Sequence, residues 1–131
     1  MKSRILAGTL LLIPMAAAQA SNWHLVSVAP SELIFLGELP PDRPSAPVIV
    51  RMLKSYEAPI SLGGWYPHRS ATLDYEIDCR SGRYALARWQ FHEGSLGQGR
   101  VVWADDMEYP VFDSPVRGSA EQKIVEVTCA R

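Results

Sequence analysis

Polar and apolar residues alternate most regularly between Ala71 and Arg80. Apolar or sulfur-bearing side chains occupy the odd positions of this segment, and polar side chains occupy the even positions. A period of two predicts a half-buried strand with one solvated face. The turn signal Ser81-Gly82 and the β-rich segment Arg83–Phe91 follow directly, so the two segments together predict a β-hairpin.

Two registers of this hairpin remain open. A two-residue loop places Tyr84 and Leu86 opposite Cys79 and Ile77. A slip of one residue turns every side chain to the opposite face of the sheet. The second register therefore buries the other set of side chains, namely Ala85, Ala87, Trp89 and Phe91.

Shorter β-prone segments flank the hairpin, and segments rich in proline, glycine or acidic residues separate them. Strands are expected at Trp23–Val28, Leu33–Leu36, Pro47–Tyr56 and Arg100–Ala104. Loops are expected where chain-breaking residues gather, at Leu39–Pro47, Ala58–Arg69, Gly94–Gly99 and Asp105–Gly118. The second of these loops is predicted to be turn-rich, with Gly63-Gly64 at its centre.

The periodicity changes near the C-terminus. Ala120, Ile124 and Val127 are spaced as on one face of an amphipathic helix, with Val125 and Cys129 alongside. Ser119, with Gln122 three residues later, has the spacing of a capping box at the start of that helix. The order of elements predicts an α+β fold, an antiparallel sheet of about five or six strands with one C-terminal helix packed on it.

The N-terminal segment predicts export. Lys2 and Arg4 precede the apolar run Ile5–Ala18, and Ala18-Gln19-Ala20 provides small residues for cleavage. The run is shorter than the roughly 20 residues that span a bilayer. Residues 1–20 are therefore expected to be a cleaved signal peptide, and residues 21–131 a single domain. The signal segment has no cysteine for lipid attachment, so we expect a periplasmic, secreted or cell-surface protein that is not a lipoprotein.

Composition narrows the class of protein further. The chain has 131 residues, of which 47% are hydrophobic, and 13 basic residues nearly balance 14 acidic ones. This near-neutral balance gives no electrostatic basis for binding nucleic acid. Cys79 and Cys129 are expected to form a disulfide, because an even cysteine count in a small exported domain is typical of one. A metal pair or a reactive thiol is disfavoured, since neither cysteine has a second ligand at suitable spacing.

No motif predicts an enzyme, a metal site or a cofactor site. His24, His68 and His92 lie far apart in the sequence, without metal-ligand spacing. The even-numbered acidic residues of the strand 71–80 read as its solvated face, and the acidic turn at 105–108 lacks the pattern of a calcium loop. Catalytic triads assemble in space and not in sequence, so a periplasmic enzyme or enzyme inhibitor remains the alternative to a binding domain.

Trp65, Tyr66, His68 and Arg69 are the candidate binding residues. They follow two glycines within Leu62–Arg69, and aromatic residues with arginine are the types that anchor binding surfaces. The competing interpretation is that Trp65 or Tyr66 packs back over the sheet edge and completes a small core.

The spacing of several short segments resembles the surface-adhesin protein E family of exported bacterial proteins. These segments are Trp23, Ser70, Tyr75-Glu76-Ile77-Asp78-Cys79, Arg83-Tyr84, Gly97-Gln98-Gly99, Pro115 to Ser119 and Cys129. The resemblance implies a small antiparallel sheet with a C-terminal helix and a disulfide. It also implies adhesion to extracellular-matrix or serum proteins of a host. We therefore expect an exported, non-enzymatic binding domain, an adhesin whose partner is a matrix or envelope protein.

Overall fold

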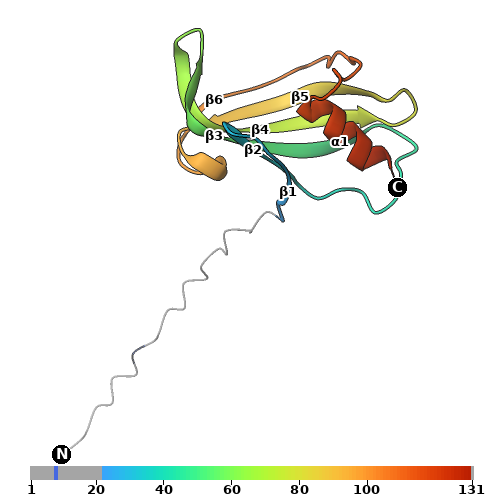
Figure 1. The fold of residues 1–131 in the computed structure, drawn as a ribbon, viewed down its shortest axis with the longest axis horizontal. Helices are drawn as coiled ribbons and strands as arrows, with labels where there is room; N and C mark the ends of the chain where they lie inside the picture. The colour runs from blue at the N-terminus through green and yellow to red at the C-terminus, as the bar shows by residue number, and fades with distance from the viewer. Residues whose placement is uncertain (1–7, 9–21, 131) are drawn as a thin grey trace, which may run out of the picture.

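Six antiparallel strands follow one another across the sheet in chain order, and one helix follows them (Figure 1). The computed structural model describes residue 8 and residues 22–130. Apart from Gly8, the predicted signal peptide lies outside these residues. The elements are β1 (His24–Val28), β2 (Glu32–Leu36), β3 (Val48–Leu62), β4 (Trp65–Asp78), β5 (Arg83–His92), η1 (Ser95–Gly97), β6 (Val101–Asp106) and α1 (Ala120–Cys129). The predicted α+β fold is confirmed.

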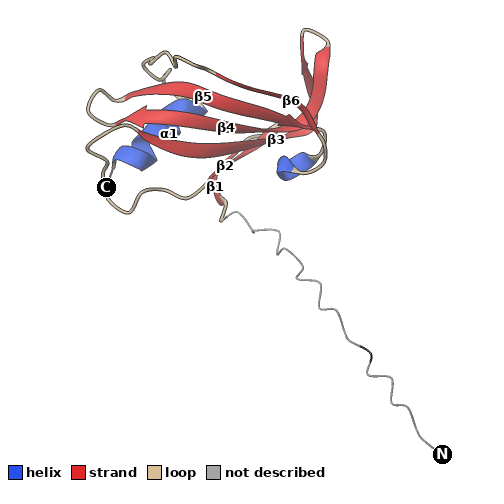
Figure 2. Cartoon of the chain, turned by 180° about the vertical axis from the view of Figure 1, so that it is seen from behind, coloured by secondary structure: helices blue, strands red, loops and turns tan. Residues whose placement is uncertain are grey.

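The core lies between α1 and one face of the sheet. Figure 2 shows the sheet from behind, with α1 on its far side. Alternate residues of the central strands point to this face, and they pack with Ile124 and Val125 of α1 in one buried cluster that includes Val50, Met52, Leu73, Tyr75 and Ile77. Each such aliphatic side chain, once buried, stabilises the fold by about 1.5–3 kcal/mol.

The helix begins where the capping pattern predicts. The Ser119 hydroxyl accepts a hydrogen bond from the Gln122 backbone N–H at 3.1 Å. The Gln122 side chain reaches back to accept from the Gly118 N–H at 2.7 Å, one residue earlier than in a standard capping box. The buried face also includes Thr128, whose Oγ1 has no hydrogen-bond partner among the described residues.

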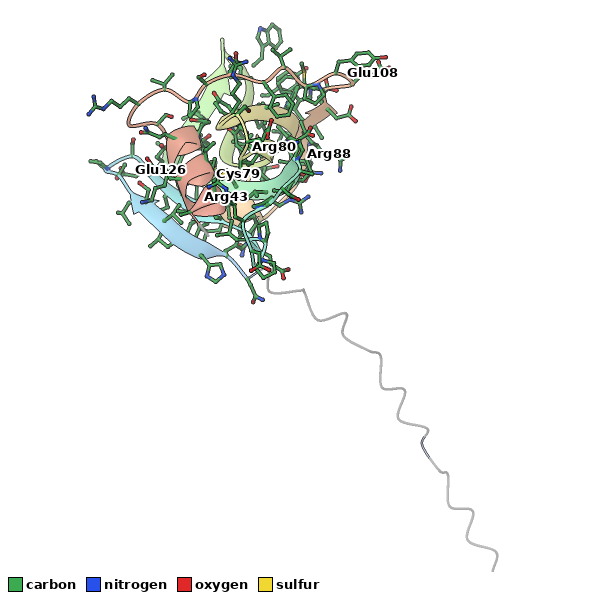
Figure 3. All side chains as sticks on the ribbon, turned by 90° about the vertical axis from the view of Figure 1, so that its right-hand side faces the viewer. Arg43, Cys79, Arg80, Arg88, Glu108 and Glu126 are labelled. Carbon is green, nitrogen blue, oxygen red and sulfur yellow. A yellow bond between two sulfur atoms is a disulfide. The ribbon has the colours of Figure 1, made fainter. Side chains whose placement is uncertain are left out.

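The end of α1 is tied to the end of β4. Cys79 and Cys129 form a disulfide with their Cα atoms 5.4 Å apart. Arg43, from the proline-rich loop before β3, lies beside this link (Figure 3). Its guanidinium donates to the Cys79 carbonyl at 3.0 Å and to the Cys129 carbonyl. A cation is favourable there, because the last carbonyls of a helix carry partial negative charge.

The β4–β5 hairpin combines the side-chain orientations of the two registers that the sequence leaves open. Tyr84 and Leu86 pair with Ile77 and Tyr75, each two residues before the partner that the first register gives, so they face the side that this register predicts. The register then shifts, and Trp89 and Phe91 pair with Leu73 and Ala71, as the slipped register requires. A β-bulge makes this switch, since one extra residue on β5 turns the following side chains to the other face. The predicted two-residue loop is wrong, because residues 79–82 form the turn.

The outer face of the sheet is less solvated than the sequence predicts. Asp74 is 7% exposed and faces Arg51 on the neighbouring strand. The Arg51 guanidinium donates to both carboxylate oxygens of Asp74, at 2.6 and 3.0 Å. This bidentate ion pair compensates the burial of the Asp74 carboxylate, so an aspartate is tolerated at this strand position.

The largest correction concerns residues 58–69, which form strands and not a turn-rich loop. β3 continues to Leu62 and β4 begins at Trp65. Gly63 and Gly64, with φ of +57° and +85°, make a two-residue turn that suits glycine. Pro59 lies within β3, where the β3–β4 register is irregular between Ser55 and Ile60, and proline is tolerated at such irregularities.

Candidate binding site on the β3–β4 arm

The distal ends of β3 and β4 project from one end of the sheet. Figure 1 shows this hairpin standing away from the plane of the other strands; we refer to its residues 58–69 as the arm. Its large apolar side chains remain exposed, and the four concerned are Ile60, Leu62, Trp65 and Tyr66. Exposed apolar side chains gathered on one projecting element are typical of a contact surface.

Trp65 and Tyr66 differ in how the fold holds them. Trp65 is 73% exposed, so it does not complete the core. Tyr66 is 46% exposed, and its ring stacks on Trp103 of β6 with centroids 5.0 Å apart. Tyr66 also has a φ of +53°, an unusual backbone conformation for an aromatic residue. Of the two interpretations of this segment, Trp65 fits the exposed anchor, whereas Tyr66 combines exposure with packing on the sheet.

His68 lies beneath this surface, although it is one of the candidate binding residues. It is 2% exposed, and its ring stacks on Phe91 at 4.0 Å. Its Nδ1 lies 2.7 Å from the Tyr66 carbonyl oxygen. Because a carbonyl can only accept, Nδ1 carries the proton in this contact. His68 therefore fixes the backbone that presents Tyr66.

An open pocket of about 540 Å³ lies at the base of the arm. Tyr66, Arg69 and Arg100 line it, together with Glu93. Arg100 forms an ion pair with Glu93 at 3.2 Å, whereas Arg69 forms none within residues 22–130. Arg69 is exposed and so can offer its guanidinium to a carboxylate outside the chain. Tyr66 and Arg69 thus line one pocket, and exposed Trp65 precedes Tyr66 on the same strand.

Residues from β5, β6 and the loop between them support the arm, a connection that no sequence pattern predicts. The Ser70 hydroxyl donates to the Gly94 carbonyl at 2.6 Å and accepts from the Gly97 N–H at 2.9 Å. The Ser55 hydroxyl accepts from the Leu96 N–H at 3.0 Å. Ser55 and Ser70 carry no local sequence signal for this role, because their burial is known only from the structure. Their partners are brought to them only by strand pairing.

His92, like Ser55 and Ser70, is a buried polar residue near the base of the arm. Its Nε2 lies 2.8 Å from the Thr72 hydroxyl, and its side chain is buried. Burial, together with the nearby His68, lowers the pKa of His92 below its ordinary value of 6.5. The folded protein therefore favours a neutral imidazole at this position.

We expect His92 to make stability depend on pH below neutrality. Its contribution is complete above about pH 6.5 and is lost as the pH falls through the folded-state pKa, because the unfolded chain binds the proton more readily. Between those two pKa values, the free energy of unfolding falls by up to about 1.4 kcal/mol per pH unit. Thermal melts between about pH 8 and about pH 5 measure this dependence.

His92→Gln is expected to flatten that pH dependence. His24→Gln, which alters an exposed histidine on β1, is the matched control and should leave it unchanged. If His92→Gln showed the same pH dependence as the unaltered protein, another group would be responsible.

Two further observations concern the described residues as a whole. Within residues 22–130, no group of three or more His, Cys, Asp or Glu side chains could hold a metal ion. No helix in the described part of the chain has the length and apolar character needed to cross a membrane.

Comparison with known proteins places the chain in a family. Residues 40–130 match the family described as Surface-adhesin protein E, and no curated protein or solved structure matches the chain. The matched segment runs from the loop before β3 to the end of α1, so it includes the arm, the disulfide and the helix. Since the match covers more than half of the 131 residues, the chain belongs to the surface-adhesin protein E family.

Proposed function

We propose that this protein is an exported, non-enzymatic domain that binds another protein through the arm. The observation that carries the proposal is the exposure of Trp65 on a hairpin that projects from the sheet, with exposed Tyr66 and Arg69 on the same strand. Membership of a surface-adhesin family supports a role in adhesion. Export with removal of residues 1–20 is part of the proposal, and the intact mass of the exported protein tests whether the chain begins at Ser21.

The way the arm is held suits protein recognition. Tryptophan, tyrosine and arginine are the residues that most often dominate binding energy in protein interfaces. Stacking of Tyr66 on Trp103 and the contact of His68 with the Tyr66 carbonyl fix part of the surface before any partner arrives. A surface that is already ordered loses less conformational entropy on binding. Arg69 favours a partner that presents a carboxylate beside an apolar patch.

We expect Trp65→Ala to weaken binding without lowering stability. Trp65 is largely exposed, so its removal should leave the melting temperature nearly unchanged, while loss of a true anchor costs at least about 2 kcal/mol, a thirtyfold or greater loss of affinity. Tyr66→Ala should lower both, because Tyr66 packs on Trp103 as well. The measurements are melting temperature and retention on immobilised extracellular-matrix proteins or envelope extract.

Tyr109→Ala is the matched control. Tyr109 is also an exposed aromatic residue, at 79%, but it lies in the loop after β6 and not on the arm. It should change neither stability nor binding. Retention by Trp65→Ala equal to that of the unaltered protein would show that the partner binds elsewhere.

A further inference from the structure

A second pocket lies between the sheet, the start of α1 and the loop that follows β6. Its volume is about 420 Å³, within the range of sites that hold small molecules. Tyr75, Tyr84 and Trp89 provide aromatic walls, and Asp113 and Glu121 provide carboxylates. None of these five residues lies on the arm, so this pocket is independent of the proposed function.

Backbone pairing holds Asp113 beside one of the aromatic residues, Tyr84. Tyr84 and Asp113 exchange two hydrogen bonds, from the Tyr84 N–H to the Asp113 carbonyl at 3.1 Å and from the Asp113 N–H to the Tyr84 carbonyl at 2.8 Å. The Tyr84 ring in turn meets the Tyr75 ring edge to face, with centroids 5.6 Å apart. The loop is thereby held against β5, so the pocket is formed without a ligand.

The two charged residues that line the pocket, Asp113 and Glu121, are both acidic. The segment Asp105–Asp113 carries four acidic residues and no basic one. Glu121 accepts a hydrogen bond from the Tyr75 hydroxyl at 2.9 Å. The Lys54 Nζ lies 3.6 Å from the same Glu121 carboxylate and partly offsets its negative charge. The start of α1 adds a partial positive charge. The Asp113 carboxylate, however, has no hydrogen-bond or ion-pair partner within residues 22–130.

We propose that this pocket binds an organic cation, a protonated amine carried on a short alkyl chain. Aromatic rings attract a cation through the negative charge of their faces, and a nearby carboxylate adds a direct ionic contact. The alkyl chain would lie against the apolar part of the pocket, which includes Leu86, Met107 and Val111. Such an amine is present in free alkylamines and in lysine side chains of peptides.

The pKa values of Tyr75 and Tyr84 are consistent with a negative electrostatic potential in the pocket. Burial, followed by the charge of Glu121, raises the pKa of Tyr75. Burial also raises the pKa of Tyr84, and Glu121 and Asp113 raise it further. The carboxylates therefore act on both hydroxyl groups, and a cation in the same space would experience their attraction.

The test uses three probes on the mature protein, followed by NMR of the aromatic and backbone resonances. N-acetyl-lysine methylamide and n-butylammonium carry the amine, and N-acetyl-norleucine methylamide is the neutral analogue. We expect saturable shifts at Tyr75, Tyr84 and Trp89 with the two amines only. Tighter binding of the lysine probe than of butylammonium assigns the site to peptides, whereas equal binding assigns it to free amines.

Variants locate the interaction. Asp113→Asn keeps the size of the side chain and should weaken binding of either amine about threefold or more. Asp42→Asn makes the same change of charge in the loop before β3 and should have no effect. Equal binding of the norleucine probe, no saturation at about 10 mM amine, or equal loss in both variants would overturn the proposal. Melting curves check that Asp113→Asn remains folded.

Discussion

Replacing both Cys79 and Cys129 by alanine should lower the melting temperature by about 10 °C or more. The disulfide closes a separation of 50 residues and joins the end of β4 to the end of α1. Without it the unfolded chain gains conformational entropy, and small secreted domains lose about 2–5 kcal/mol when a native disulfide is removed. Thermal melts followed by circular dichroism measure the change.

Chemical reduction provides the control for this prediction. A reductant should lower the melting temperature of the unaltered protein to that of the double variant, and it should have no effect on the variant itself. Arg43 remains in both forms, and its hydrogen bonds to the Cys79 and Cys129 carbonyls do not require the sulfur atoms. The prediction would be contradicted if the double variant had the same melting temperature as the oxidised, unaltered protein.

Ile124→Ala should destabilise the domain by about 2–5 kcal/mol, because it removes a fully buried side chain from the contact between α1 and the sheet. The cost includes the transfer energy of the lost atoms and the cavity that they leave. Denaturant titration measures the free energy of unfolding directly.

Glu126→Ala is the matched control on the same helix. Glu126 is exposed, and alanine favours the helix at least as well, so its effect should stay within about 0.5 kcal/mol. The loss of stability in Ile124→Ala can also be compared with the loss in the variant that lacks both cysteines. If Ile124→Ala behaved like Glu126→Ala, the helix would contribute little to the stability of the sheet.

The elements with a long, regular pattern were predictable from sequence. The alternation from Ala71 to Arg80 predicted the central strand, and the capping residues Ser119 and Gln122 predicted the start of the helix. Both rest on local physics, since side-chain periodicity and capping depend on residues close in the chain. Thr128 was missed as part of the core because a threonine carries no apolar signal.

The remaining features depend on residues that are far apart in the sequence. The sequence predicts a turn-rich loop for the arm because Gly63 and Gly64 lie at its centre, whereas pairing with β4 extends β3 to Leu62. The bulge in β5 was invisible because each candidate register satisfied part of the hydrophobic pattern. Arg43 contacts carbonyls 36 and 86 residues away, and no local pattern predicts such a partner. The candidate binding residues were identifiable by type, whereas Trp103 of β6 and Arg100, just before that strand, become neighbours of Tyr66 and Arg69 only in the folded chain.

The strictly sequential strand order also bears on how the chain reaches its native state. Every strand after β1 pairs with the one just before it, so each antiparallel pair can form as soon as its second strand is available. The last helix, in contrast, packs on strands formed much earlier in the chain, and Cys129 bonds to Cys79, 50 positions before it. The Cys79–Cys129 disulfide can therefore form last, after the sheet and the helix have assembled. With two cysteines in the chain, a single intramolecular pairing exists, and oxidation within one molecule cannot trap a wrongly paired isomer.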